Sequence, residues 1–167
     1  MNVLIDSRTI HNAVVRAARE VSERYRDKPV LLVGVLTGSF VFTADFCREM
    51  TIPCEVAFMS ASSYGNSDVS SGDVKIKLDL DRDLTKYHVI VLEDIIDTGN
   101  TLSRLAACLS RRSPLSLEVI TLLDKPSRRE ADFEPDRSLF TIPDLFVVGY
   151  GLDYAEKYRA LPFIAVM

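Results

Sequence analysis

Apolar residues recur at spacings of three and four near the start of the chain, which predicts a helix from about residue 6 to residue 25. Asp6 or Ser7 can cap its first turn. The segments 40–50 and 101–112 are also predicted to be helices, and Pro53 marks the far side of the first of them. Between these helices lie short apolar runs, so that helices and strands alternate along the chain.

The predicted strands are 30–36, 55–62, 74–81, 88–94, 116–124 and 146–154. Several of them are continuous apolar runs, which are typical of strands covered on both faces. At 74–81 apolar and charged residues alternate instead, which predicts a half-exposed strand paired with 55–62 in an antiparallel hairpin. The alternation of strands and helices predicts an α/β fold with a mostly parallel central sheet flanked by helices.

Composition is that of one folded domain. The chain has 167 residues, of which 47% are hydrophobic and 26% charged, so it can bury a core. Its net charge is −4, so no overall basic field recruits nucleic acid or an anionic membrane. An anionic substrate would therefore need a local binding site.

The cysteines and the chain start indicate where the protein resides. Cys47, Cys54 and Cys108 lack metal-ligand spacing and are typical of reduced thiols in a cytoplasmic protein. We find no signal peptide at the N-terminus and no apolar run near the roughly 20 residues that span a membrane.

The stretch VLEDIIDTGNT (91–101) carries the clearest chemistry. Glu93 and Asp94 stand at the carboxyl end of a predicted buried strand, where ligands bind in open α/β sheets. Asp97 opens a turn that leads into a helix, whose free N–H groups and positive dipole end attract anions. Gly99 allows the backbone to approach a ligand closely. One segment thus offers a phosphate site beside carboxylates that can accept hydrogen bonds from a diol, as a sugar phosphate requires; the alternative is a solvated acidic turn with an ordinary cap.

This stretch resembles the phosphoribosyl-diphosphate (PRPP) signature of type I phosphoribosyltransferases. The version with two isoleucines before DTG is similar to the hypoxanthine-guanine phosphoribosyltransferases. Further segments resemble the family in the same order, namely VGVLTGSFVFTADFCRE, SSYGNSDVSSGDVKI, TLLDKPSRRE and PDLFVVGYGLDYAEKYRALPFI. The resemblance implies one phosphoribosyltransferase domain over 1–167, with a small hood formed by parts of the N- and C-terminal segments and a mobile lid hairpin at about 62–73.

The resemblance also assigns roles within the stretch. Glu93 and Asp94 match the acids that hold the ribose hydroxyls. Asp97 matches the residue that faces purine N7 as a general base or as a partner for the N7 proton. The 5′-phosphate would bind the turn that Asp97 opens, formed by Thr98, Gly99, Asn100 and Thr101.

Three residues match the family's base-binding positions. Lys125 matches the lysine that donates to the 6-oxo group of the purine. Phe146 matches the aromatic residue that stacks on the base, and Val147 the residue whose backbone reads its edge. Without the family context, Lys125 could be a solvent-exposed charge and Phe146 a core residue.

Asp153 and Arg159 match residues that serve the pyrophosphate end of PRPP. Asp153 matches an acid that helps to hold Mg²⁺, together with substrate phosphates and the acids Glu93 and Asp94. Arg159 matches the arginine that contacts pyrophosphate. From the sequence alone these two residues could be an ordinary surface pair.

Two loops complete the site that the resemblance implies. Leu36, Thr37 and Gly38 match the pyrophosphate loop, which uses backbone amides and has a non-proline cis peptide that would fall before Thr37. Many relatives have Lys or Arg at the position of Thr37, so this chain lacks a cation there and keeps the backbone donors. Ser63 and Tyr64 would belong to the lid; the alternatives are a plain turn and a hairpin tip without function.

These assignments predict Mg²⁺-dependent transfer of 5-phosphoribosyl from PRPP to N9 of a 6-oxopurine, with release of pyrophosphate and the nucleotide product. The base would be hypoxanthine or guanine, with xanthine also open, and relatives form dimers or tetramers. Two alternatives remain: a non-enzymatic regulator that binds PRPP or a nucleotide and RNA, and a transferase for adenine or a pyrimidine. The acidic composition disfavours the first, and Lys125 disfavours the second, because a donor does not pair with a 6-amino group.

Overall fold

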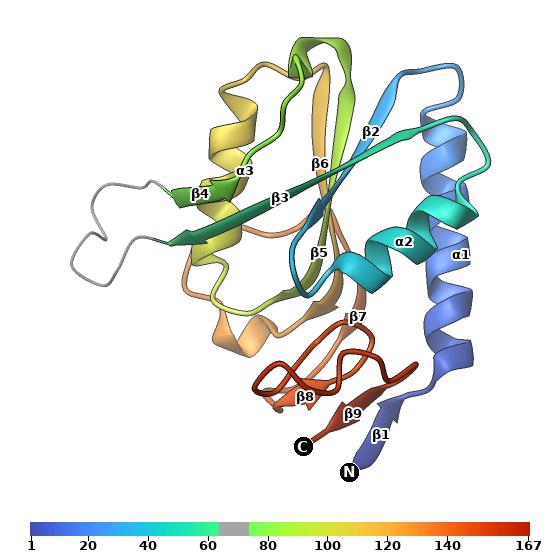
Figure 1. The fold of residues 1–167 in the computed structure, drawn as a ribbon, viewed down its shortest axis with the longest axis vertical. Helices are drawn as coiled ribbons and strands as arrows, with labels where there is room; N and C mark the ends of the chain where they lie inside the picture. The colour runs from blue at the N-terminus through green and yellow to red at the C-terminus, as the bar shows by residue number, and fades with distance from the viewer. Residues whose placement is uncertain (64–73) are drawn as a thin grey trace.

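A central sheet of six strands organises the protein, and the computed structural model describes residues 1–63 and 74–167. The strand order is β4-β3-β2-β5-β6-β7 (Figure 1). The strands are β2 (Val30–Val35), β3 (Glu55–Ser63), β4 (Val74–Leu78), β5 (His88–Ile96), β6 (Ser116–Asp124) and β7 (Arg137–Thr141). All neighbouring pairs are parallel except β3 and β4, which confirms a mostly parallel α/β fold with one antiparallel addition.

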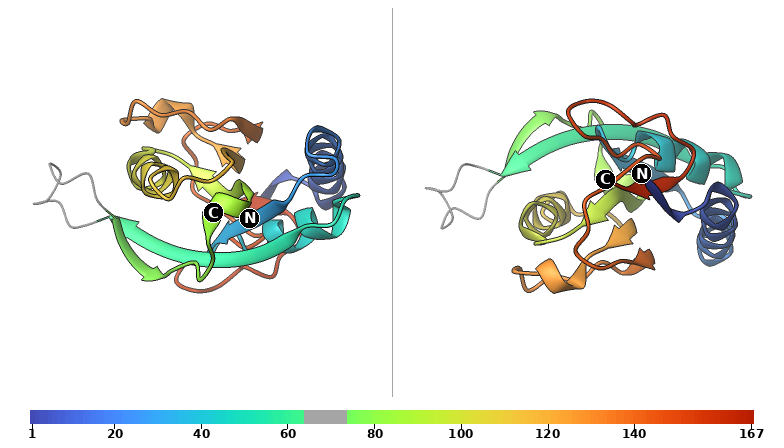
Figure 2. Two further views of the ribbon diagram at one scale, coloured as in Figure 1. Left: turned by 90° about the horizontal axis from the view of Figure 1, so that it is seen from above. Right: turned by 90° about the horizontal axis from the view of Figure 1, so that it is seen from below.

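Three helices cover the two faces of this sheet: α1 (Ser7–Arg24), α2 (Phe40–Glu49) and α3 (Asn100–Ser110). The backbone N–H of Thr9 donates to the Asp6 carboxylate at 2.8 Å, which caps α1 as expected. Leu32 belongs to the apolar core beneath α1 and α2, whereas its neighbours on β2, Leu31 and Val33, belong to the core beneath α3. Successive side chains of a strand face opposite sides of the sheet. The uninterrupted apolar strands therefore contribute side chains to the cores on both faces, beneath the helices (Figures 1 and 2).

A second, antiparallel sheet joins the two ends of the chain, in the order β1-β9-β8. It consists of β1 (Asn2–Ile5), β9 (Ile164–Val166) and β8 (Val147–Val148). The termini consequently lie side by side, as all three views show (Figures 1 and 2). This small sheet occupies the place that the sequence analysis assigned to the hood.

Some element boundaries differ from the sequence-based prediction. The predicted strand at 146–154 is wrong beyond Val148, because Gly149, Tyr150 and Gly151 have φ angles of 99°, 51° and 100° that turn the chain out of extended conformation. The strand predicted to end at residue 94 continues to Ile96, because Ile95 and Ile96 still pair with β6. The strand predicted at 74–81 ends at Leu78, which is exposed. The patterns did not predict β1, β7, β9 or the short 3-10 helices η2 (Leu84–Lys86) and η3 (Pro126–Arg128).

The parallel arrangement places the ends of β2, β5 and β6 at one edge of the sheet. The loop at 36–39 follows β2, the turn at 97–99 follows β5, and η3 lies just after β6. These are the connections that hold most of the predicted site residues. No helix among residues 1–63 and 74–167 is long and apolar enough to cross a membrane, and the cysteines, all of them in this part of the chain, carry free thiols.

Candidate active site

Two adjacent acids follow the buried run 89–92 of β5 at this edge of the sheet. Glu93 and Asp94 are half-buried. The N–H of Asp94 donates to Oε1 of Glu93 at 3.1 Å, and the N–H of Ile95 donates to Oδ1 of Asp94 at 2.8 Å. Burial raises the pKa of Glu93 well above its ordinary value, and the charge of Asp94 raises it further. Burial also raises the pKa of Asp94. The pair is therefore arranged to accept hydrogen bonds or to face a cation.

The turn after β5 is built around Gly99, whose φ of 79° lies in the left-handed region. The N–H of Thr98 donates to Oδ1 of Asp97 at 2.6 Å, and the N–H of Asn100 donates to Oγ1 of Thr98 at 3.3 Å. A hollow of about 90 Å³ opens at this turn and at the start of α3, and its lining includes Glu93, Asp97, Thr98, Gly99 and Thr101. The hollow lies where a phosphate site is expected, at a helix N-terminus beside the acid pair.

Arg129 holds this turn in place, and the sequence analysis did not single it out. Its guanidinium donates to the carbonyl of Asp97 at 2.5 Å, to Asp124 at 2.6 Å and to Glu134 at 3.1 Å. Only 9% of its side chain is exposed. Asp124 and Glu134 each lie five residues away in the sequence, but the contact that fixes the turn joins Arg129 to Asp97 across two connections of the sheet. The sequence alone therefore does not distinguish Arg129 from the neighbouring Arg128.

A larger pocket of about 310 Å³ adjoins the turn and brings together residues predicted from three segments of the chain. Its lining includes Asp97, Lys125, Phe146, Val147 and Asp153. Lys125 is 12% exposed, and its Nζ lies 3.8 Å from Oδ1 of Asp144. The ring of Phe146 is 54% exposed, and its edge-on neighbour Tyr154 lies 5.7 Å away. An exposed aromatic face opposite a lysine can hold a flat heterocycle that carries an acceptor group.

Asp144 and Arg128 also line this pocket, and the sequence analysis did not predict them. Arg128 approaches Oδ2 of Asp144 to 3.7 Å, whereas Lys125 approaches Oδ1 of the same carboxylate. Asp144 belongs to the motif IPD (142–144), which by itself indicates only a turn. Its contact with Lys125 depends on the pairing of β6 with β7 and could not be inferred locally.

The loop after β2 packs directly on the acid pair. The peptide bond between Leu36 and Thr37 is cis, as the family resemblance implies. A Cβ atom at Gly38 would overlap the Asp94 carboxylate, and one at Gly151 would overlap the carbonyl of Gly38. Only glycine allows this close approach at either position. The side chain of Thr37 lies at the surface.

Arg159 reaches the same place from the C-terminal segment. It donates to the carbonyl of Gly151 at 2.7 Å and lies 3.5 Å from Asp153. Its positive charge opposes the burial that raises the pKa of Asp94. The loop at 36–39, Asp94 and Arg159 thus form one cluster around the end of β5.

The predicted metal ligands do not form a group by themselves. Among residues 1–63 and 74–167 no three or more His, Cys, Asp or Glu side chains are placed so that they could hold a metal ion together. Asp153 lines the larger pocket and Glu93 the smaller one. A hard cation such as Mg²⁺ would therefore need substrate oxygens in addition to protein carboxylates.

The lid assignment falls largely outside the described residues. Ser63 is the last residue of β3, and Tyr64 and the rest of the predicted lid up to residue 73 are not described.

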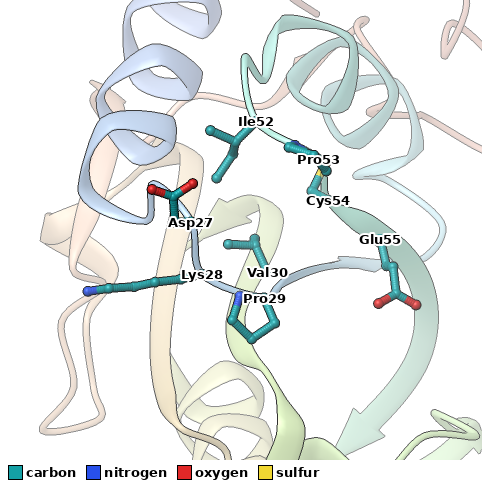
Figure 3. Close-up of a pocket in the computed structure, with 8 residues that line it drawn as sticks. All are labelled: Asp27, Lys28, Pro29, Val30, Ile52, Pro53, Cys54 and Glu55. Atoms are coloured by element: carbon teal, nitrogen blue, oxygen red, sulfur yellow. The ribbon is translucent and has the colours of Figure 1, made fainter.

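A hollow of about 380 Å³ lies elsewhere, between the segments 27–30 and 52–55 (Figure 3). Both segments precede or begin the strands β2 and β3, so this hollow is at the amino end of the parallel strands. None of the predicted site residues lines it. The predicted site residues lie at the opposite edge.

Fold and site together define an α/β protein that can bind a sugar phosphate next to a planar base. The family model of the phosphoribosyl transferase domain matches residues 4–155. The chain belongs to the phosphoribosyltransferase family.

Individual relatives are similar to this chain along nearly its whole length. It is 50% identical over 166 residues to the hypoxanthine phosphoribosyltransferase of Salmonella typhimurium, covering 98% of this chain and 93% of the relative. It is 47% identical over 165 residues to the hypoxanthine-guanine phosphoribosyltransferase of Bacillus subtilis, covering 99% and 92%. The crystal structure of a hypoxanthine phosphoribosyltransferase from Staphylococcus aureus superposes with a TM-score of 0.94 at 40% identity, covering 100% of this chain and 91% of that one.

Replacing Arg129 by lysine tests its role in holding the turn. Lysine keeps the charge but cannot reach three acceptors in a fixed fork. We expect Arg129→Lys to lower the free energy of unfolding by about 2–3 kcal/mol, measured by urea denaturation. Arg128→Lys is the matched control, because Arg128 is 49% exposed and has only a 3.7 Å contact; its effect should stay within about 0.5 kcal/mol. Equal effects of the two variants would refute the role of Arg129.

The raised pKa of Glu93 predicts how its substitution depends on pH. A carboxyl whose pKa is higher in the folded than in the unfolded state stabilises the fold below its unfolded pKa, near 4.5, and loses this contribution as pH rises through the folded pKa. Glu93→Gln should therefore raise Tm at pH 8 relative to the wild type, and this gain should vanish near pH 4. A gain that is independent of pH would contradict the prediction.

Proposed function

We propose that this protein transfers the 5-phosphoribosyl group of PRPP to N9 of a 6-oxopurine, which releases pyrophosphate and forms the nucleotide in purine salvage. The base is hypoxanthine or guanine, and xanthine is a further candidate. One observation carries the proposal: Asp97, Lys125, Phe146 and Val147 line a single pocket beside the phosphate turn. The names of the similar proteins support the same reaction.

The acid pair and the turn bind the phosphoribosyl group. Glu93 and Asp94 accept hydrogen bonds from the two ribose hydroxyls, which relieves the repulsion between their half-buried carboxylates. The 5′-phosphate binds the hollow at 98–101, where backbone N–H groups and the Thr98 and Thr101 hydroxyls surround it. Arg129 keeps this turn rigid, so the phosphate is bound without reorganisation of the protein.

The larger pocket selects and orients the base. Lys125 donates to the 6-oxo group, and Phe146 stacks on the ring plane, which covers a face that is otherwise exposed. The backbone of Val147 reads the edge of the base. A 6-amino group would place a donor against the lysine, so adenine should be rejected.

Asp97 and the leaving-group cluster lower the barrier. Asp97, which lines the larger pocket, faces N7 of the purine and takes the N7 proton as N9 attacks C1′. The amides of the loop at 37–39 and the guanidinium of Arg159 stabilise the charge on departing pyrophosphate. Thr37 adds no positive charge to this loop.

The carboxylates present fit Mg²⁺ only in combination with substrate. Glu93, Asp94 and Asp153 supply hard oxygen ligands, and the diphosphate and ribose oxygens would complete the coordination. When bound, Mg²⁺ would neutralise charge on the diphosphate.

We also place the protein in the cytoplasm, as a homodimer or homotetramer. Free thiols at Cys47, Cys54 and Cys108 fit a reducing compartment. The exposed aromatic rings of Phe40 and Phe58 support self-association. Light scattering in solution distinguishes the dimer from the tetramer.

An assay of pyrophosphate release from PRPP tests the proposed reaction. Hypoxanthine and guanine should support turnover, adenine should not, and EDTA should abolish the reaction with every base. Turnover with adenine equal to that with hypoxanthine would refute the role of Lys125. An undiminished rate in EDTA would refute the need for Mg²⁺.

The substitution Asp97→Asn tests the proton-transfer role. Asparagine keeps an oxygen that can accept from the Thr98 N–H, so the turn and PRPP binding should survive. We expect kcat with hypoxanthine to fall about 100-fold or more, in steady-state kinetics. The control Asp27→Asn removes a carboxylate from the hollow at the opposite end of the sheet and should leave kcat unchanged. An unaltered kcat for Asp97→Asn would remove Asp97 from the mechanism.

A further inference from the structure

Tyr150 connects the C-terminal segment to α2 through one partly buried hydrogen bond. Its side chain lies in the turn 149–151, is 6% exposed, and donates from its hydroxyl to Oδ2 of Asp45 at 2.6 Å. Burial raises the pKa of this hydroxyl, and the Asp45 carboxylate raises it further, so the hydroxyl remains a donor at neutral pH. Arg48, one turn later on α2, pairs with the same carboxylate and orients it.

The turn that carries Tyr150 contacts both groups assigned to pyrophosphate. The N–H of Gly151 donates to the carbonyl of Arg159 at 2.9 Å, and the Gly151 carbonyl accepts from the Arg159 guanidinium at 2.7 Å. Gly151 also lies against the carbonyl of Gly38, so closely that a Cβ atom would not fit. A displacement of this turn would therefore move Arg159 relative to the loop at 36–39.

Two hollows border the contact between the turn and α2. A hollow of about 320 Å³ lies between the helices and the C-terminal segment, lined by Ser7, His11, Val41, Asp45, Tyr150 and 159–162. A second hollow of about 400 Å³ lies on the other side of Asp45, lined also by His11 and Arg48. Side chains on both sides of the Tyr150–Asp45 bond thus border open space. The Tyr150–Asp45 bond therefore adds a directional link between the turn and α2 to the apolar packing of the Tyr150 ring.

We propose that Tyr150 and Asp45 are positioning residues for the transfer reaction, which hold Arg159 in register with the loop at 36–39 so that both contact the diphosphate of PRPP. The inference rests on the roles proposed above for that loop and for Arg159. It assigns no contact with substrate to Tyr150 or Asp45. Loss of Tyr150 or Asp45 should weaken the binding of PRPP more than that of the base, because the proposed contacts of the base are Lys125 and Phe146.

The substitution Tyr150→Phe removes only the hydroxyl. We expect the KM for PRPP to rise about tenfold, equivalent to about 1.4 kcal/mol, while the KM for hypoxanthine changes less than about twofold. Asp45→Ala should reproduce this pattern without endangering the fold, because alanine favours helices. Asp45→Asn keeps an acceptor oxygen and should retain a KM for PRPP near that of the wild type. The double variant Tyr150→Phe/Asp45→Ala should be no worse than either single variant.

Tyr25→Phe is the matched control for a general loss of stability. Tyr25 also donates its hydroxyl to a buried carboxylate, Glu118, at 3.1 Å, but its ring packs against His88 at the start of β5, whereas the diphosphate loops lie at the carboxyl ends of the strands. It should leave both KM values unchanged. An unchanged KM for PRPP in Tyr150→Phe and Asp45→Ala, or an equal rise in both KM values, would overturn the inference.

Arg159→Ala separates this inference from the proposed function. If Arg159→Ala raises the KM for PRPP and Tyr150→Phe does not, the role of Arg159 stands and the positioning role fails. If Arg159→Ala has no effect on this KM, the pyrophosphate role of Arg159 fails, and with it the register that Tyr150 is inferred to maintain.

Discussion

Two carboxylates are kept close together and half-buried at the end of β5, and the rest of the site follows from this constraint. Burial and mutual repulsion both disfavour the doubly charged pair of Glu93 and Asp94. The loop at Gly38 lies directly against Asp94, so the pair cannot relax toward that side. We propose that binding a diol, with a cation held jointly by the substrate, relieves this unfavourable arrangement. The protein thus uses part of its folding stability to keep a site ready for a phosphoribosyl group.

The parallel sheet explains how distant segments reach this pair. The ends of β2, β5 and β6 share one edge, which brings together the loop at 36–39, the turn at 97–101 and Lys125. The C-terminal segment then returns across this edge, and the glycines at 149 and 151 allow it to lie against Gly38. Arg129 stabilises the turn from one side, and the Tyr150–Asp45 bond fixes the C-terminal segment from the other.

Much of this could be predicted from the sequence, and the omissions share a cause. Apolar periodicity predicted the main helices and the central strands, and the stretch at 91–101 predicted an anion site next to acids. The roles of Lys125, Phe146, Asp153 and Arg159 came from the family resemblance, because each residue alone is compatible with an ordinary surface or core position. The strands β1 and β9 were missed because they are short and pair with each other from opposite ends of the chain. The strand β7 was missed because it is short and only partly buried, so no apolar run marks it. Arg129 and Tyr150 were missed for a similar reason, since their partners lie in other elements.

The most direct test of the account is a crystal structure of the protein with its nucleotide product, inosine 5′-monophosphate. In this structure we expect the phosphate to bind the backbone amides of 98–101 and the ribose hydroxyls to bind Glu93 and Asp94. The purine should lie between Lys125 and Phe146. A nucleotide bound in another orientation, with its phosphate away from this turn, or in the hollow between 27–30 and 52–55, would contradict it.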